Sequence, residues 1–411
     1  EYVWHGQVNP FGIAFDSFGN LFTADCHTKP AYCLLRGACY PSLGKPHDGL
    51  GLGPKLIEHS HGSTSISGIA YYAADQYPKE YRENVFMGNS VTGRVNRDRI
   101  EIHGSSLVGI EQSDFVTCDD RWFRPVELKL GPDGALYIAD FYDCIIGYYE
   151  VPLTHPRRDK TRGRIWRVVY RGTDAEPQSL RKTSDLTKLD LEQLLPRLAD
   201  PNLQVRLLTT HEIVDRIGVD AIPTVRAEIM KAKDARFRAH GLWVLDRLGA
   251  LDGDLIARLS KDSSRLVRVH LLKALAEKQW QDSKIPMAEL AREMLFDSDA
   301  LVRRTAADAL GRHPDSMNVP LLTRLWSETN TEDTFLIHTV RMALRDQLSE
   351  PAIFDEHANL EGNTDLTNRL LDVSLGIRKE KPAAFILAAL KANKTDPRRL
   401  NEFIRFATRY V

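Results

Sequence analysis

One strand signature occurs twice in this sequence, and it points to a repeated β structure in the first part of the chain. Residues 16–25 read DSFGNLFTAD and residues 132–140 read PDGALYIAD. In each, a polar turn closed by glycine leads into a short run of small, apolar and aromatic residues that ends in aspartate. A turn feeding a short strand, repeated far apart in the chain, is typical of β-propeller blades.

The segments that open each repeat keep a similar spacing. GIAF at 12–15, GIAYY at 68–72 and VELKL at 126–130 follow one another at intervals of 56 and 58 residues. This spacing exceeds the usual propeller range of about 40–50 residues, and inserted loops would account for the excess. Three blades fit before residue 170, whereas closed propellers have about 4–8. We therefore expect a partial β-propeller, in an internal fragment of a longer protein whose earlier blades lie upstream.

The second half of the chain has a helical pattern. Segments that begin with aspartate recur at Asp200, Asp234, Asp262 and Asp297, and three of them read DPNLQVR (200–206), DSSRLVR (262–268) and DSDALVR (297–303). We expect each aspartate to be a helix N-cap, and Pro201 and Pro397 to occupy the first helical position. The apolar spacing at i, i+3 and i+4 gives each helix one face to bury, which stacked pairs of helices can do in a solenoid.

This D-x-x-x-x-V-R pattern resembles HEAT repeats of the short, PBS-lyase-like type. The arginines of the pattern, Arg206, Arg268 and Arg303, are expected to form ion pairs between repeats or to bond carbonyls. The stretch from 171 to 189 is polar and contains a proline, as linkers do. We predict a partial β-propeller over 1–170, a linker over 171–189 and an all-α HEAT-type solenoid over 190–411.

Composition excludes some classes of function. The 55 basic residues nearly balance the 56 acidic ones, which does not suggest a nucleic-acid-binding or membrane-surface protein. No run of 18 apolar residues is present to span a membrane.

The cysteines form no C-x-x-C motif, so this piece has neither a zinc ribbon nor a c-type haem motif. They are interpreted as small apolar side chains with one disulfide, and a metal cluster with His27 is the alternative. The five cysteines are Cys26, Cys33, Cys39, Cys118 and Cys144.

The residues suited to chemistry lie in loops of the propeller region, where functional residues concentrate on a rigid scaffold. A histidine-rich loop carries Glu58, His59 and His61 just before the second opening at Gly68. Glu58 and the two histidines could hold a metal ion, although a loop lacks the fixed spacing of a helical metal motif. Further candidates, each at a strand end, are Asp25, Asn89, Arg94, Arg124 and Asp140. The structural alternative is that the aspartates cap turns by accepting backbone amides.

Several long stretches of the propeller region occur together in one known family. They include TADCHTKP (23–30), EHSHGSTSISGI (58–69), GNSVTGRVNRDR (88–99) and VELKLGPDGALYIADFYD (126–143). This part of the chain resembles the membrane-bound dehydrogenase domain of planctomycetes and verrucomicrobia. That domain is in turn similar to the propeller of soluble pyrroloquinoline-quinone (PQQ) sugar dehydrogenases.

The resemblance implies PQQ-dependent oxidation of sugars or alcohols. His61 would be the catalytic base. The cofactor would be bound by Arg124, Arg94 and Asn89. Calcium would bind at Asp25 and Asp140, and His61, Arg124 and Asp140 would then approach one cavity.

The same resemblance implies that electrons pass to a c-type haem elsewhere in the protein or on a cytochrome partner, outside the cytoplasm. The alternative from another class is a non-catalytic propeller and HEAT scaffold, whose solenoid binds protein partners in a larger assembly.

Overall fold

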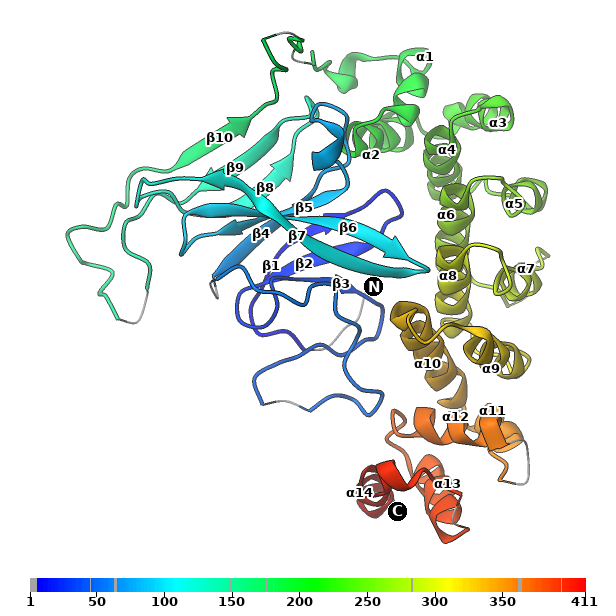
Figure 1. Cartoon of the computed structure of the whole chain (residues 1–411). Helices are drawn as coiled ribbons and strands as arrows, with labels where there is room; N and C mark the ends of the chain where they lie inside the picture. Colours follow the sequence, from blue (N-terminus) through cyan, green and yellow to red (C-terminus); the bar gives the residue numbers. More distant parts are fainter. Residues whose placement is uncertain are drawn as a thin grey trace.

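The fold is known from a computed structural model, which describes residues 6–411 except 45, 63–64, 148–149, 175, 180, 282–283, 361–363 and 393. Antiparallel sheets occupy the first part of the chain, and stacked helices occupy the rest (Figure 1). The sheets lie on one side of the helical stack. No helix among the described residues is both long enough and apolar enough to span a bilayer.

The described strands form three antiparallel sheets, each in sequence order. The first has β1 (Pro10–Phe15), β2 (Leu21–Asp25) and β3 (Ala31–Leu34); the second has β4 (Ile66–Tyr71), β5 (Asn84–Asn89), β6 (Arg94–His103) and β7 (Ser106–Thr117); the third has β8 (Pro125–Leu130), β9 (Leu136–Asp140) and β10 (Arg164–Val168). The three predicted openings lie in the first strands, β1, β4 and β8. The expectation of repeated antiparallel sheets is thus confirmed, while these described sheets do not by themselves show a closed propeller.

The first strands of the three sheets touch through their backbones. Each carries an irregularity in its strand pairing at the predicted opening. A Cβ atom on Gly12 would lie 2.8 Å from the Ile69 nitrogen, and one on Gly68 would lie 2.5 Å from the Glu127 Cα. The φ angles of Gly12 and Gly68, 65° and 57°, also favour glycine. The repeated glycine is therefore explained by close packing of β1 on β4 and of β4 on β8.

The helices begin after β10 and the segment that follows it. They are α1 (Leu191–Leu194), α2 (Leu203–Glu212), α3 (Ile222–Lys231), α4 (Ala235–Arg247), α5 (Gly253–Leu259), α6 (Arg265–Ala276), α7 (Met287–Met294), α8 (Ala300–Gly311), α9 (Asn318–Glu328), α10 (Thr334–Leu348), α11 (Pro351–His357), α12 (Thr364–Ser374), α13 (Glu380–Lys391) and α14 (Leu400–Tyr410). Helices α4, α6, α8 and α10 form an inner row next to the sheets, and α3, α5, α7 and α9 form an outer row (Figure 1). This is the paired, stacked arrangement expected of a solenoid.

Three helix starts differ from the sequence prediction by the same shift. Helix α2 is capped by Asn202, and Asp200 instead accepts a hydrogen bond from the Asn202 nitrogen at 2.8 Å. Pro201 therefore lies before the N-cap and not at the first helical position. Asp262 and Asp297 make the same turn two residues upstream of the caps of α6 and α8. Each aspartate is short enough to accept a hydrogen bond from the backbone N–H two residues later. It therefore stabilises the turn before the helix and does not cap the helix itself.

Two other predicted helix starts are confirmed. Asp234 caps α4 by accepting a hydrogen bond from the Arg236 nitrogen. Pro397 lies at the start of the short 3₁₀ helix η6 (Pro397–Arg399), which Asp396 caps. The missing N–H of proline costs nothing at this position.

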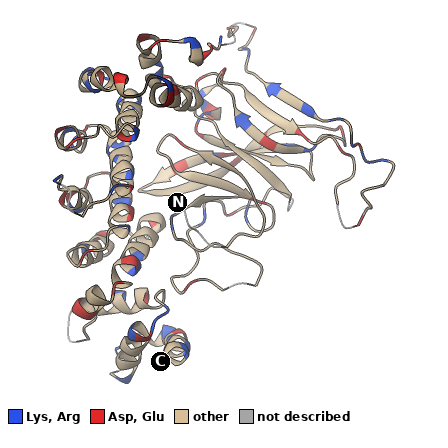
Figure 2. Ribbon diagram, turned by 180° about the vertical axis from the view of Figure 1, so that it is seen from behind, with Lys and Arg blue, Asp and Glu red and all other residues tan. Residues whose placement is uncertain are grey.

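The arginines of the repeat pattern form the two kinds of contact that were predicted, an ion pair between repeats and hydrogen bonds to carbonyls. Arg268 makes two hydrogen bonds to the carboxylate of Asp297, at 2.8 and 2.9 Å. Arg303 donates to the Asp297 carbonyl at 2.8 Å, and Arg206 to the Asp200 carbonyl at 2.5 Å. Both basic and acidic residues occur along the helices in Figure 2. The two-point contact of Arg268 with Asp297 joins two successive repeats, whereas Arg206 and Arg303 bond carbonyls of their own repeats.

The inner row of helices is joined to the sheets by buried polar contacts. Asp333, the N-cap of α10, accepts hydrogen bonds from the Ser105 nitrogen at 2.7 Å, the Ser105 hydroxyl at 2.8 Å and the Ser106 hydroxyl at 2.9 Å. Arg304 of α8 donates to the Ser105 carbonyl at 2.6 Å and to Asn20 Oδ1 at 2.5 Å. Since buried polar groups are costly to leave unpaired, these contacts fix the β6–β7 turn on the solenoid.

Two histidines of the inner row, the buried His338 and the partly buried His270, are held in the neutral form. The Nε2–H of His270 donates to the Ser17 carbonyl at 2.8 Å, and its Nδ1 accepts from Trp243 at 3.0 Å. Burial lowers the pKa of His270 to about 4 and the pKa of His338 to about 3. These pKa values lie below the value of about 6.5 for an exposed histidine.

We expect the chain to lose stability as the pH falls from about 6.5 to about 4, because the unfolded chain binds more protons in this window. Replacing His270 with glutamine should flatten this dependence. The matched control is His103→Gln, which makes the same change at a histidine whose side chain is 62 % exposed. Urea unfolding of the three proteins at about pH 5 and about pH 7 measures the effect. An unchanged pH dependence in His270→Gln would contradict it.

Candidate functional site

The two histidines of the loop before β4 meet at one carboxylate of β6. His59 Nε2 lies 2.7 Å from Asp98 Oδ1, and His61 Nε2 lies 2.9 Å from Asp98 Oδ2. The side chain of His61 is 2 % exposed and that of Asp98 is fully buried. An ionised carboxylate can only accept hydrogen bonds, so both Nε2 atoms carry the proton. In the neutral imidazole, the Nδ1 atom of His61 then keeps its lone pair.

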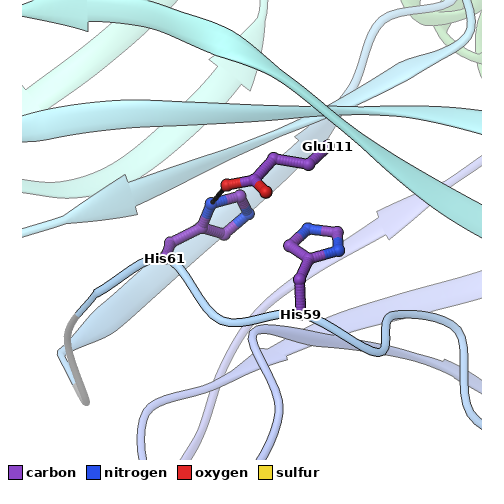
Figure 3. Close-up of side chains that lie close together, drawn as sticks. All are labelled: His59, His61 and Glu111. Carbon is purple, nitrogen blue, oxygen red and sulfur yellow. Dashed lines mark ion pairs between the residues drawn. The ribbon is translucent and has the colours of Figure 1, made fainter.

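Glu111 of β7 lies on the other side of His61. Its Oε1 is 3.5 Å from His61 Nδ1, and its side chain is 55 % exposed (Figure 3). The rings of His59 and His61 are 5.0 Å apart and nearly perpendicular. One potential ligand atom from each of His59, His61 and Glu111 lies within 4.8 Å of the others. The site therefore combines a buried histidine–aspartate pair with a carboxylate open to solvent.

Hydrogen bonds fix the loop that carries these histidines. Asn89, at the end of β5, donates through Nδ2 to the His61 carbonyl and to Asn96 Oδ1, both at 3.1 Å. The Gly109 nitrogen of β7 donates to the Leu56 carbonyl at 2.7 Å. Asn89, which the resemblance assigned to cofactor binding, lies next to the site and holds the backbone of His61.

Arg124 is engaged mainly by backbone carbonyls. Its guanidinium donates to the carbonyls of Asp143 at 2.9 Å, Ser90 at 3.1 Å and Cys144 at 3.4 Å. Burial lowers the pKa of this guanidinium. The side chain therefore connects the loop after β9 to the end of β5, next to Asn89.

Both carboxylate oxygens of Asp140 accept hydrogen bonds from other residues of the protein. Oδ1 accepts from the nitrogens of Arg124 at 2.8 Å and Tyr142 at 3.0 Å. Oδ2 accepts from Arg164 Nε at 2.6 Å and Trp166 Nε1 at 3.0 Å. In this arrangement Asp140 caps the end of its strand, which is the structural alternative considered for it.

Two other predicted residues also have protein partners. Asp25 accepts from the Val8 nitrogen at 3.1 Å and from the His27 nitrogen at 2.9 Å. Arg94 forms an exposed ion pair with Asp114 at 2.7 Å. The metal role of Asp25 and the cofactor role of Arg94 stay predictions.

The cysteine loop differs from what the sequence predicted. All five cysteines are free thiols, and Cys26, Cys33 and Cys39 are buried. Burial raises the pKa of Cys33 to about 12, which keeps it a thiol. The interpretation as small apolar side chains fits this placement, whereas the expected disulfide is not formed.

Glu111 was missed by the sequence analysis, whereas Asp98 lies in the stretch GNSVTGRVNRDR (88–99), which carries part of the resemblance. A signal for both exists in the β6–β7 hairpin, where His103 pairs with Ser106 around a turn at Gly104. Counting back along both strands from that turn places Asp98 opposite Glu111, as the structure has them. Reading the glycine turn as a two-residue hairpin would have found this pair.

Two family descriptions match parts of the chain. Residues 2–172 match a domain of unknown function (DUF7133), and residues 251–344 match HEAT repeats. The solenoid is thus a HEAT array over the second range. No curated protein matches the chain.

Some solved structures show weak similarity. An oxidoreductase (glucose dehydrogenase) from Thermus thermophilus is 20 % identical, with a TM-score of 0.27 over 34 % of this chain and 40 % of its own. Another glucose dehydrogenase is 24 % identical, with a TM-score of 0.26 over 34 % of this chain and 39 % of its own. The Escherichia coli protein YibA is 16 % identical, with a TM-score of 0.27 over 56 % of this chain and all of its own. The chain therefore spans less than half of these dehydrogenases, and likeness at this level carries no functional argument.

Proposed function

We propose that the sheet region is the catalytic part of an oxidoreductase that acts on a hydroxyl group of a sugar or alcohol, with His61 as general base. The observation that carries this proposal is the hydrogen bond between His61 Nε2 and the buried Asp98, at 2.9 Å. A carboxylate behind an imidazole fixes its tautomer and stabilises the imidazolium that forms when the other nitrogen takes a proton. Here that other nitrogen is Nδ1, on the side of the exposed Glu111.

The residues of this chain account for the proton of the reaction. Oxidising an alcohol to a carbonyl releases the hydroxyl proton and a hydride equivalent. We assign the proton to His61 Nδ1. The hydride equivalent, with its two electrons, needs an acceptor, which the resemblance gives as a quinone of the PQQ class.

In this structure the residues expected to hold PQQ and calcium are engaged by other groups of the protein. Arg124 donates to backbone carbonyls, Arg94 to Asp114, and Asn89 to the His61 carbonyl. Asp140 already accepts four hydrogen bonds, so it offers no open oxygen to a calcium ion. We therefore assign no step of the reaction to a residue bound to the quinone.

Two further parts of the proposal rest on the resemblance alone. Electrons would continue to a c-type haem elsewhere in the protein or on a cytochrome partner. The protein would work outside the cytoplasm, in the periplasm or at the cell envelope.

A second candidate function is a scaffold without catalysis. It is favoured by the HEAT repeats over residues 251–344, since such repeats are generally protein-interaction modules. The outer row of helices, α3, α5, α7 and α9, faces away from the sheets and would be the surface for partners (Figure 1).

Dye reduction by the purified protein, supplied with PQQ and calcium and offered a panel of sugars and alcohols, tests the catalytic proposal. His61→Asn should lower kcat/KM by about 10²–10⁴-fold, the usual contribution of a general base. The control, His103→Gln, changes an exposed histidine of the same sheet and should leave kcat/KM unchanged. If the wild type reduces no dye with any substrate, the scaffold is favoured. If His61→Asn equals the wild type, the base is elsewhere.

A further inference from the structure

The arrangement around His61 places two electron-rich atoms face to face. In the neutral imidazole, whose Nε2 donates to Asp98, the lone pair of Nδ1 points toward Glu111 Oε1, 3.5 Å away. A nitrogen lone pair and a carboxylate oxygen repel at this distance unless a proton or a cation lies between them. His59 brings a third potential ligand atom within 4.8 Å of both.

We propose that His59, His61 and Glu111 bind one divalent transition-metal ion of the zinc class. Two imidazole nitrogens and one carboxylate oxygen form a donor set that zinc accepts, and three protein ligands leave a position for water or a substrate oxygen. Calcium prefers about 6–8 oxygen ligands, so this site differs in chemistry from the calcium site that the resemblance implies.

Asp98 supports metal binding without being a ligand. Histidines that bind metals commonly donate their second ring N–H to a carboxylate, which fixes the ring and raises its basicity. Asp98 does this for His61, whose Nε2 lies 2.9 Å away while its Nδ1 faces Glu111, and Asp98 is itself fully buried. Its charge and that of Glu111 together balance a divalent ion.

The loop and strand that carry the ligands are held next to each other. The Gly109 nitrogen bonds the Leu56 carbonyl at 2.7 Å, three residues before His59 and two residues before Glu111 along their own segments. Ligand atoms must draw closer than 4.8 Å around an ion that binds them at about 2.0–2.1 Å. The Glu111 side chain, which is half exposed, has room to make this movement and leaves a path from solvent.

Metal binding at this site does not depend on the proposed oxidoreductase activity. Both use the same atom, His61 Nδ1, so a molecule with the metal bound cannot take a proton there. If both inferences are right, added zinc should inhibit dye reduction. If only the metal site is right, zinc binds to a protein that reduces no dye.

Titration of chelator-treated protein with Zn²⁺, and with Co²⁺ as a coloured probe, tests the site. One ion per chain should bind and raise the thermal unfolding midpoint. Glu111→Gln and His59→Gln should each weaken binding by more than about 10–100-fold, the loss typical of a supporting residue such as Asp98. The control is Glu101→Gln, which makes the same chemical change on β6, where Glu101 pairs instead with Arg99 and His103.

Three results would overturn the proposal: no saturable binding of Zn²⁺, equal binding by the wild type and Glu111→Gln, or displacement of Zn²⁺ by an equal concentration of Ca²⁺. Because Glu111 is half exposed, Glu111→Gln should fold, and its metal-free unfolding midpoint should equal that of the wild type. If Glu111→Gln loses metal binding while this midpoint is unchanged, the loss is due to the missing carboxylate ligand and not to unfolding.

Discussion

Replacing Gly68 with valine should destabilise the chain by about 3–5 kcal/mol. Its φ angle of 57° is unfavourable for a branched side chain, and a Cβ atom there would lie 2.5 Å from the Glu127 Cα and 2.8 Å from the Val126 carbonyl oxygen. These are backbone atoms of β8, which cannot rotate away as a side chain would. Urea unfolding of the variant and the wild type measures the difference in the free energy of unfolding.

Gly44→Val separates the two causes of this loss. Gly44 has a similar φ angle of 65°, but a Cβ atom there would have nothing within 4 Å. We expect this control to lose only the backbone strain, about 1–2 kcal/mol. Equal losses in the two variants would mean that β4 and β8 do not touch at Gly68.

Asp333→Ala should cost about 3–5 kcal/mol, because it removes a helix cap and leaves donors of the β6–β7 turn without a partner. Three of these donors lie within 2.9 Å of its carboxylate: the nitrogen and hydroxyl of Ser105 and the hydroxyl of Ser106. The loss should also release the sheets from α10. Urea unfolding gives its size, and limited proteolysis shows whether the β6–β7 turn becomes accessible.

Asp299→Ala is the matched control for the second prediction. Asp299 caps α8 by accepting from the Leu301 nitrogen at 2.9 Å, and its ion pair with Arg265 is within the solenoid. Loss of this cap should cost only about 1 kcal/mol. If the two aspartates cost the same, the contact between solenoid and sheets contributes nothing beyond the cap.

The fold could be predicted where local patterns determine it. The openings at Gly12 and Gly68 mark first strands because a glycine is needed where neighbouring backbones touch. Helix α2 is capped two residues later than predicted, because Asp200 stabilises the turn before the helix. An aspartate side chain can do either, and the sequence pattern alone does not say which. The hydrogen bond between Ser105 and Asp333 joins residues 228 positions apart. No local sequence pattern predicts such a contact.

The candidate site was predictable only in part, for the same reason. His61 stood out as a histidine in a glycine-rich loop before a strand. Glu111 lies about fifty residues later, and the register of the β6–β7 hairpin places it next to His61. No feature of the sequence around Glu111 marks it as a site residue. The resemblance assigned Arg124 to cofactor binding, but its guanidinium bonds carbonyls of the loop after β9 and of the residue after β5. Whether an arginine meets a ligand or a backbone carbonyl depends on tertiary structure.

Anomalous diffraction at the zinc edge, from crystals of the protein grown with zinc, tests most directly whether the chemistry of the sheet region lies at the His61 cluster. We predict one strong peak bounded by His59, His61 and Glu111, with Asp98 still bonded to both histidines. A zinc peak at Asp25 or Asp140 with none at His61, or a structure in which Glu111 points away from His61 with no ion between them, would contradict it.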